Sequence, residues 1–475
     1  MRYSFFLLCL CSQLVALEQR PLGLTSLTVE TPQTKLKPTA EIPKWLDGTL
    51  VRNGPALFNI GQTYVPHWFD GLAMLHAFRF AGGQVVYQNR FLRSSAYEKM
   101  VVEKSLDFPG FGQSAGKQEV AFIPNANINV ATFAGKCVAL TEIPLPVIFD
   151  LETLDTIGRF HYQDTLPKAK IWECAHPHTD QKTGDVINYH VQFFPEAKYV
   201  IYTMKKGSSA REVLAEIPVT KPAYMHSFAL TEHYVILVEF PLFIDPQDIL
   251  KGGSFSSHYK WEPSKQMRIL VVDRQSKELC GQYLAEPVFA WHHINSYEDK
   301  GSLVIDMAAY SDARTFTHPE DNGDTEQNRM ARFVRYTVNL DSKKVVKEQV
   351  GPSVEMPRIN YNSFNGKPYN YVYGYDDTHD LEGLKRRGLV KIDTKTKHSI
   401  LWSLDGCIAD EPVFVARPGA ITEDDGVLLA CVLDTNARKS FLLILDAKKY
   451  TEIARVELPH HIPYGLHGDY LRSEL

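Results

Sequence analysis

The stretch Val390-Lys-Ile-Asp393-Thr-Lys-Thr396 contains a pattern that recurs along the chain: an apolar run ends in Asp and a polar turn follows. An Asp side chain accepts hydrogen bonds from the backbone just after it, so each copy predicts a closed β-hairpin. A weaker copy is Asn339-Leu-Asp341. The other three copies are Val147-Ile-Phe-Asp150, Leu270-Val-Val-Asp273 and Leu443-Ile-Leu-Asp446.

The copies are regularly spaced. Asp341 lies 52 residues before Asp393, which lies 53 residues before Asp446. Repeats of roughly 40–50 residues are typical of propeller blades, each a four-stranded sheet. Short β-type runs dominate the 475 residues, and helical periodicity is scarce, so the class is all-β, with room for six to eight blades. A large β-sandwich and several small β domains stay open as alternatives. The clearest runs are 138–141, 234–239, 268–273, 302–307, 331–338, 369–375, 427–433 and 441–445.

Composition is that of an ordinary globular protein, with 44% hydrophobic and 23% charged residues. The net charge of −5 gives no electrostatic reason to bind nucleic acid, so we expect no nucleic-acid partner. The one tight basic cluster, Lys385-Arg386-Arg387, is interpreted as a solvated loop.

The two ends of the sequence are similar to known targeting signals. Residues 1–16 combine a basic residue, a short apolar run and a small final residue, as a secretory signal peptide does. Residues 17–48 are interpreted as an extended arm and residues 49–475 as one domain. The ending Arg472-Ser-Glu-Leu475 is similar to an endoplasmic reticulum retention signal. We therefore expect the secretory pathway, with the lumen of that organelle as a destination; a cytoplasmic or peripheral membrane protein is the alternative.

The chain contains 17 histidines, and several follow apolar runs. His292 and His293 come after Phe289-Ala-Trp; His176, His226 and His467 stand in similar surroundings. The steps of 50 residues from 176 to 226 and 66 from 226 to 292 are about one blade each. Inner strands of separate blades could therefore bring four imidazoles to one metal ion. Singly, each is as well explained as a hydrogen-bonded core residue, and spacing does not choose between His292 and His293.

Three glutamates lie in apolar contexts where an unpaired carboxylate would be costly, namely Glu142, Glu355 and Glu411. Because ligating imidazoles usually donate their other N–H to a carboxylate or carbonyl, these glutamates are candidate partners of the histidines. The alternative interpretation places them in turns or edges beside prolines.

A set of motifs in fixed order covers nearly the whole chain. They are Leu50-Val-Arg-Asn-Gly-Pro, His67-Trp-Phe-Asp70-Gly-Leu-Ala-Met-Leu-His76, Ala175-His176-Pro-His, His226-Ser-Phe-Ala-Leu-Thr-Glu, His292-His-Ile-Asn295-Ser-Tyr-Glu-Asp, Glu411-Pro-Val-Phe-Val and His467-Gly. In these motifs the sequence resembles the carotenoid cleavage oxygenases, a family that includes animal β-carotene oxygenases and the retinoid isomerohydrolase. The resemblance implies a seven-bladed β-propeller with a loop-and-helix cap over the iron-bearing face.

Carried over by position, the resemblance makes His176, His226, His292 and His467 the ligands of Fe(2+), leaving His178 and His293 without that role. Their hydrogen-bond partners become Glu142, Glu355 and Glu411, and Ile128 shields an oxygen-binding position. The implied reaction is that of a non-haem Fe(II) dioxygenase, in which O2 cleaves a conjugated C=C bond of a carotenoid or apocarotenoid to carbonyl products.

A long apolar polyene requires an apolar tunnel, for which Phe69, Tyr97, Phe108, Phe111, residues 240–243 and Phe255 are candidates. Lys136 departs from the animal pattern: stilbene-cleaving members carry a lysine there, with Tyr97 as a partner. A stilbenoid-cleaving dioxygenase, a retinoid or carotenoid isomerase and a non-catalytic carotenoid-binding protein remain alternatives. The Pro-Asp-Pro-Cys segment of the animal branch is missing, and peripheral membrane contact would fall to Phe108, Phe111 and residues 240–250.

Overall fold

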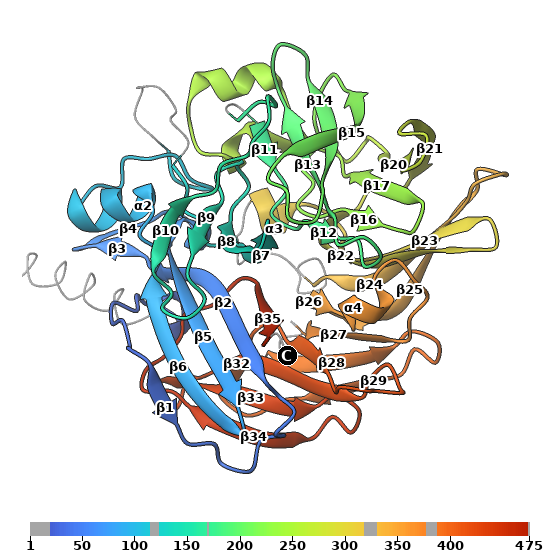
Figure 1. The fold of residues 1–475 in the computed structure, drawn as a ribbon. Coiled ribbons are helices and arrows are strands. Elements are labelled where there is room, and N and C mark those ends of the chain that lie inside the picture. The colour runs from blue at the N-terminus through green and yellow to red at the C-terminus, as the bar shows by residue number, and fades with distance from the viewer. Residues whose placement is uncertain (1–19, 115–122, 169–170, 318–329, 377–386, 474–475) are drawn as a thin grey trace, which may run out of the picture.

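The computed structural model describes residues 20–114, 123–168, 171–317, 330–376 and 387–473. The leader of residues 1–16, the basic pair Lys385-Arg386 and the last two residues of the C-terminal tetrapeptide lie outside these ranges. In the described part of the chain, seven antiparallel sheets of four or five strands surround a common axis (Figure 1). The predicted seven-bladed propeller is therefore confirmed, and the sandwich alternative is wrong.

We number the sheets as blades 1–7 in chain order and give their strands from the outer to the inner edge. Blade 1 contains β1 (Thr34–Leu36), β6 (Gln84–Phe91), β5 (Leu72–Ala81), β2 (Gly48–Leu57) and β35 (Gly468–Arg472). Blade 2 contains β10 (Thr156–Arg159), β9 (Val147–Phe149), β8 (Lys136–Leu140) and β7 (Asn129–Phe133). Blade 3 contains β15 (Arg211–Pro218), β14 (Lys198–Met204), β13 (Val186–Gln192), β11 (Ile171–Glu173) and β12 (His178–Thr179).

The remaining four blades have the same order. Blade 4 contains β21 (Leu279–Ala285), β20 (Met267–Asp273), β17 (Tyr234–Glu239) and β16 (Ala229–Leu230). Blade 5 contains β25 (Val345–Ser353), β24 (Arg332–Asn339), β23 (Ser302–Tyr310) and β22 (Phe289–Asp299). Blade 6 contains β29 (Ser399–Trp402), β28 (Gly388–Asp393), β27 (Tyr371–Asp376) and β26 (Glu355–Arg358). Blade 7 contains β34 (Glu452–Glu457), β33 (Lys439–Asp446), β32 (Gly426–Asp434), β30 (Cys407–Ala409) and β31 (Val413–Ala416).

The predicted Asp turns close the hairpins as expected. The Asp393 carboxylate accepts hydrogen bonds of 2.9 Å from the backbone N–H groups of Lys395 and Thr396. Asp150, Asp273 and Asp446 accept equivalent pairs. In each case the fourth residue after the Asp is left-handed, as Lys397 is at φ 61°. In the weaker copy the acceptor is Asn339, not Asp341.

The ring closes where the two ends of the described chain meet in blade 1. β35 pairs antiparallel with β2, with Arg472 opposite Gly48 and Gly468 opposite Arg52. β1, within the expected arm, forms the outer strand beside β6. The core lies between blades: Phe78 and Tyr87 of blade 1, for example, belong to one buried cluster with Leu442 and Ile444 of blade 7. Burial between such faces removes large apolar areas from water and fixes each blade against the next.

Several short elements outside the blades form the predicted cap. The cap includes η2 (Trp68–Asp70), η4 (Pro246–Lys251), η5 (Ser256–His258), α3 (Arg314–Thr317) and the hairpin of β18 (Leu242–Ile244) with β19 (Tyr259–Trp261). The buried Asp70 carboxylate accepts hydrogen bonds from the N–H groups of Phe111 (2.6 Å) and Gly112 (3.0 Å) and so fixes that segment. The remaining short elements are η1 (Leu22–Leu24), β3 (Asn59–Ile60), β4 (Thr63–Tyr64), α2 (Ser95–Tyr97), η3 (Glu98–Val102) and α4 (Tyr361–Phe364).

Candidate metal centre and its cavity

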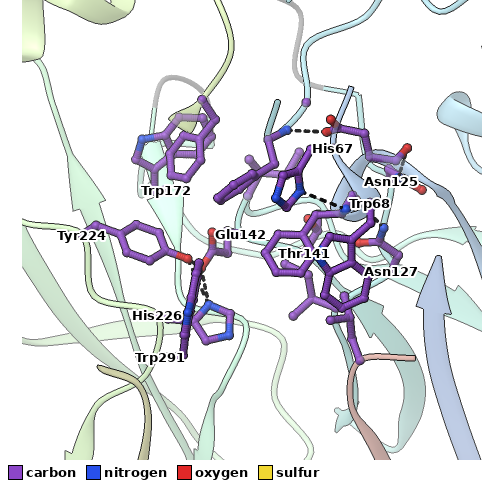
Figure 2. Close-up of a pocket in the computed structure, with 18 of the residues that line it drawn as sticks. His67, Trp68, Asn125, Asn127, Thr141, Glu142, Trp172, Tyr224, His226 and Trp291 are labelled. Atoms are coloured by element: carbon purple, nitrogen blue, oxygen red, sulfur yellow. Dashed lines mark hydrogen bonds and ion pairs between the residues drawn. The ribbon is translucent and has the colours of Figure 1, made fainter. Parts of the chain in front are cut away.

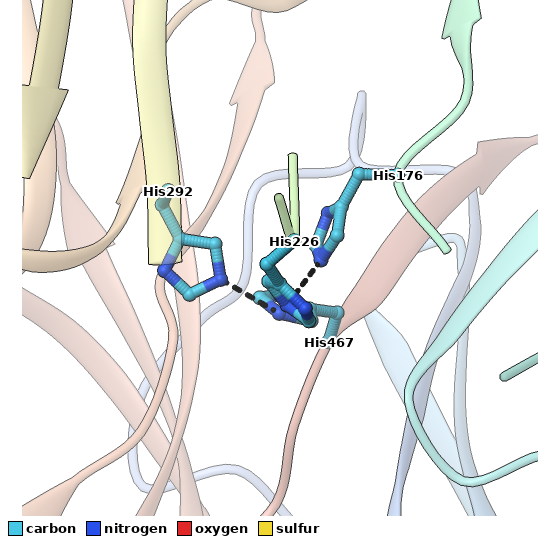
Figure 3. Close-up of side chains that lie close together, drawn as sticks. All are labelled: His176, His226, His292 and His467. Atoms are coloured by element: carbon cyan, nitrogen blue, oxygen red, sulfur yellow. Dashed lines mark hydrogen bonds between the residues drawn. The ribbon is translucent and has the colours of Figure 1, made fainter. Parts of the chain in front are cut away.

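Four histidines from four different blades meet near the axis (Figure 3). His176 lies between β11 and β12, His226 just before β16, His292 in β22 and His467 just before β35. One ring nitrogen of each lies within 4.8 Å of those of the others. Inner strands of neighbouring blades contact one another, as β16 contacts β22 and β35 contacts β7. The propeller thus brings distant histidines to one point.

Three of the four imidazoles are held by glutamates from blades 2, 6 and 7. His226 Nδ1 lies 2.7 Å from Glu142, His292 Nδ1 lies 2.6 Å from Glu355, and His467 Nδ1 lies 2.8 Å from Glu411. These bonds place the proton of each neutral ring on Nδ1, so Nε2 presents its lone pair to the centre.

The inward nitrogens fit a cation. His292 Nε2 and His467 Nε2 are 3.1 Å apart, and His176 Nε2 and His226 Nε2 are 2.9 Å apart. In neutral rings whose Nδ1 atoms carry the protons, the first pair has no N–H to share and two lone pairs face each other. Burial lowers the pKa of His467 to about 3, so this ring is neutral at physiological pH. A shared metal ion removes the repulsion, and the donor set suits iron, copper or zinc.

Of the three glutamates, Glu411 forms the most hydrogen bonds and ion pairs. Its carboxylate is paired with Arg52, accepts from Arg358 Nε at 2.8 Å and accepts from the Gly468 N–H at 3.0 Å. Burial alone would raise the pKa of Glu411, but Arg358, His467 and Arg52 hold it well below its usual range. Glu411 therefore stays ionised and can keep accepting the His467 proton.

A mostly apolar cavity of about 280 Å³, which we call the apolar cavity, lies between the cluster and the cap (Figure 2). His226, His292 and His467 are part of its lining. Aromatic rings contact one another along its wall: Phe69 to Phe111 at 5.0 Å, Phe69 to Trp291 at 5.9 Å and Trp291 to His226 at 5.3 Å between centroids. Such a wall suits a rigid apolar molecule with one end beside the metal centre.

A second recess, the polar pocket, has about 510 Å³ and reaches the same centre among the inner strands. It shares His292 and His467 with the apolar cavity and adds His176 and Glu411. The rest of its lining is rich in polar side chains, including Asn129, His178, Asn295, Arg358, Asn360, Tyr361 and Asp469.

Most predicted neighbours of the site line the apolar cavity. Ile128 does so beside His467, whose N–H donates to the Ile128 carbonyl at 2.9 Å. Phe69, Phe108, Phe111 and Phe255 do so from the cap.

Other expected contacts are not in this cavity. Lys136 is exposed at the tip of the β7–β8 hairpin, opposite Phe133, and lines neither recess. Tyr97 packs 6.1 Å from Phe91, under Arg93, in a separate hollow. Phe240 and Leu242 are fully buried core residues. Lys136 is exposed because it follows the two-residue turn between β7 and β8. Tyr97 lies away from the cavity because its helix, α2, packs on β5 of blade 1.

The structure also distinguishes the two histidines in His176-Pro-His178 and the two in His292-His293. His178 binds the Tyr361 hydroxyl at 2.8 Å and the Phe228 carbonyl at 3.0 Å, and His293 Nδ1 contacts the Ser227 hydroxyl at 2.9 Å. Neither is part of the cluster, which contains His176 and His292.

Sequence reasoning missed several residues that support the centre. Tyr224 and Tyr310 donate to Glu142 (2.8 Å) and Glu355 (3.0 Å), and Arg52 and Arg358 are paired with Glu411. Only Arg52 carried a signal, since it lies in the motif Leu50-Val-Arg-Asn-Gly-Pro.

Comparison with known proteins agrees with this geometry. The family model described as retinal pigment epithelial membrane protein matches residues 24–472. A mitochondrial carotenoid-cleaving dioxygenase of Macaca fascicularis is 30% identical, covering 98% of this chain and 94% of that protein. A carotenoid isomerooxygenase of Galleria mellonella is 32% identical, over 91% of this chain and 92% of its own length. The β,β-carotene 15,15'-dioxygenase of Mus musculus is 31% identical, over 92% and 88% respectively.

Solved structures are similar over almost the whole chain. A mutant of the Synechocystis apocarotenoid oxygenase has a TM-score of 0.85 at 26% identity and covers 95% of this chain and 98% of its own. A cobalt-substituted form of that oxygenase has a TM-score of 0.83 at the same identity and coverage. With a matching family model, a shared propeller and a four-histidine centre, the chain belongs to the carotenoid cleavage oxygenase family.

Proposed function

We propose that the protein is a non-haem Fe(II) dioxygenase that cleaves a conjugated C=C bond of a carotenoid or apocarotenoid. The observation that carries this is the meeting of four imidazoles whose free nitrogens point together, with three of the rings lining an aromatic-walled cavity. The balance is one C=C bond and one O2 consumed for two C=O groups formed. His176, His226, His292 and His467 would hold the iron, which supplies binding and activation of O2.

The protein's own contribution is orientation. Each Glu–His hydrogen bond fixes one ring, so His226, His292 and His467 keep their free nitrogens aimed at the metal. A four-imidazole donor set adds no negative charge to the metal's coordination shell, and the three carboxylates lie one bond further out. The arrangement thus keeps the centre positively charged.

The apolar cavity selects the class of substrate. Its aromatic wall buries a flat polyene without requiring hydrogen bonds along its length, and it excludes most water from the reacting bond. Phe111 and Trp291, whose centroids are 6.4 Å apart, belong to this wall. Ile128 beside His467 fits the role of shielding one position at the metal.

The alternatives differ in support. The stilbenoid interpretation has less support, because neither Lys136 nor Tyr97 lines the apolar cavity. A combined isomerase activity remains a second candidate, because the relative from Galleria mellonella is a carotenoid isomerooxygenase. A binding protein without catalysis would have no need of four free imidazole nitrogens at one point.

We further propose peripheral membrane contact at the cavity mouth. Ile249, in η4, lines the apolar cavity, and the adjacent Leu250 is 62% exposed beside Lys251. An apolar substrate could leave a bilayer there without crossing water. Within the described ranges, no helix combines the length and the apolar character that crossing a membrane requires. Entry into the secretory pathway, through the leader and the C-terminal tetrapeptide, remains a proposal that localisation of the tagged full chain would test.

The decisive experiment is to load the purified protein with Fe(II) and offer β-carotene, a lutein-type xanthophyll, an apocarotenal and resveratrol. Mass spectrometry under ¹⁸O2 should find two carbonyl fragments, both labelled, from a polyene. Metal-free protein is the control. Aldehydes from resveratrol alone, or a rearranged polyene without oxygen uptake, would overturn the proposal.

A further inference from the structure

The polar pocket opens at the surface among the inner strands of the propeller. Three of the four histidines of the cluster line its inner end. Exposed residues line its outer part, on or next to β7, β12, β26 and β35, which lie close to the axis (Figure 1). They include Thr132, Gln181, Asn362, Asp469 and Arg472. Within the described ranges, none of the cap elements lines this pocket, so it reaches the centre from outside the cap.

His176 is the member of the cluster that is most accessible from this pocket. It is half-buried, whereas His226, His292 and His467 are only 7%, 8% and 3% exposed. It lines the polar pocket and not the apolar cavity. In the described structure it is also the one imidazole of the four that no glutamate holds. The four nitrogens are therefore most open to a new ligand on the side of the polar pocket.

The two recesses differ in what they offer to a metal ion in water. A cation carries a shell of water molecules, and losing that shell in apolar surroundings costs far more than polar contacts at a surface return. Polar cavities hold water, whereas apolar cavities stay dry. The polar pocket, with about 510 Å³, has room for several water molecules, whereas aromatic rings such as Phe111 and Trp291 form the wall of the apolar cavity. A hydrated cation therefore meets the lower barrier in the polar pocket.

The charges of the pocket do not oppose this passage. Its lining contains two carboxylates, of Glu411 and Asp469, and two guanidinium groups, of Arg358 and Arg472. Arg358 Nε donates to Glu411 at 2.8 Å, and Arg472 donates to the Ala416 carbonyl. Since the two positive charges are matched by two negative ones and both arginines are engaged, no net positive charge repels a cation.

We propose that a hydrated divalent metal ion enters and leaves the centre through the polar pocket, and that His176 is the ligand it meets first. This inference rests on the proposed function for one point, that the four histidines bind a metal. Metal and polyene then use different routes, because the polyene occupies the apolar cavity. The protein can therefore exchange its metal while a polyene is bound.

The test narrows each recess in its outer part with one tryptophan, in the full chain. Thr132→Trp does so in the polar pocket and Ile249→Trp in the apolar cavity. Lys136→Trp is the matched control, because Lys136 is exposed on the same hairpin as Thr132 but lines neither recess. Gln181→Trp, on another blade, is a second polar-pocket variant that decides the question if Thr132→Trp does not fold.

The measurement is the rate of metal exchange. Binding of Co(II) to the metal-free protein is followed by visible absorbance after rapid mixing, and its release is followed in the presence of excess chelator. A narrower route raises one barrier for both directions, so Thr132→Trp should slow kon and koff by the same factor and leave Kd unchanged. The expected factor is about tenfold, which a barrier higher by about 1.4 kcal/mol produces. Ile249→Trp and Lys136→Trp should leave both rates unchanged.

The outcomes separate the route from the proposed function. Slower exchange in Ile249→Trp, or unchanged exchange in both polar-pocket variants, overturns the route and leaves the proposed function standing. A weaker Kd without equal slowing of both rates in these variants also overturns it, since they would then act on the ligands. Slowing as expected, in a parent protein that cleaves no polyene, supports the route and overturns the proposed function. Failure of the parent to bind Co(II) overturns both.

Discussion

The apolar cavity and the polar pocket reach the same two histidines, His292 and His467, through very different surroundings. The first is bounded by the cap and by aromatic rings such as Phe111 and Trp291; the second is bounded by polar side chains such as Arg358 and Tyr361. The comparison shows two environments around one centre. Aromatic rings and the carboxylates of Glu142 and Glu355 lie on the cap side, whereas Glu411 and its arginine partner Arg358 lie on the strand side.

The largest expected effect distinguishes two neighbours on one strand. His292→Ala should weaken metal binding by more than about 100-fold and abolish turnover, because even the outer partners of metal ligands contribute 10–100-fold. His293→Ala, which changes only the wall of the polar pocket, should keep the metal. Iron content by mass spectrometry and product formation are the measurements. An inactive, metal-free His293→Ala beside an active His292→Ala would reverse the assignment.

The next effect compares one phenylalanine from each recess. Phe111→Ala should lower kcat/KM for a polyene by about tenfold or more, since burying such a ring is worth about 1.5–3 kcal/mol. Phe414→Ala, in the polar pocket, should stay within about threefold, because Phe414 stacks on Tyr373 at 5.4 Å and lies outside the apolar cavity. Steady-state kinetics with both variants at equal iron content decides this. Equal losses would mean that the polyene also enters the polar pocket.

A smaller effect is expected from removing one of the arginines that pair with Glu411. Arg358→Gln removes one of its two arginines, while Arg52 remains. Metal affinity should fall by about tenfold, near the lower limit for such outer partners. Titration with Co(II), followed by its visible absorbance, measures this directly. Arg417→Gln, which removes an exposed pair with Asp425, is the control. An unchanged metal affinity in Arg358→Gln would show that Arg52 alone is enough to support the Glu411 carboxylate.

The smallest effect is predicted for a residue in neither recess. Lys136→Ala should change turnover of a polyene by less than about twofold, because Lys136 is exposed on its hairpin. Assays with a carotenoid and with resveratrol check this. A selective loss with resveratrol would restore the stilbenoid alternative and require that hairpin to move.

The fold was largely predictable because its signals are local. Asp393 closes its turn through the two residues that follow it, and the run predicted at 234–239 is β17 with the same ends. His292 was harder to choose. β22 pairs with β23 with register irregularities between residues 290 and 292 and between 293 and 295, so side-chain alternation does not tell which histidine faces inward. The supports Arg358, Tyr224 and Tyr310 depend on contacts between blades, which no local pattern encodes.

The order of the chain has a consequence for how the centre is assembled. His467 directly precedes β35, the strand that closes the ring on β2. While the chain is being synthesised, three ligands can already be folded, yet neither the fourth ligand nor the seam of blade 1 exists until residues 467–472 emerge. A metal that binds only the closed ring stabilises it by mass action. A bound metal would then stabilise the closed ring only at the end of synthesis, and metal starvation should leave newly made chains open at that seam and sensitive to proteases.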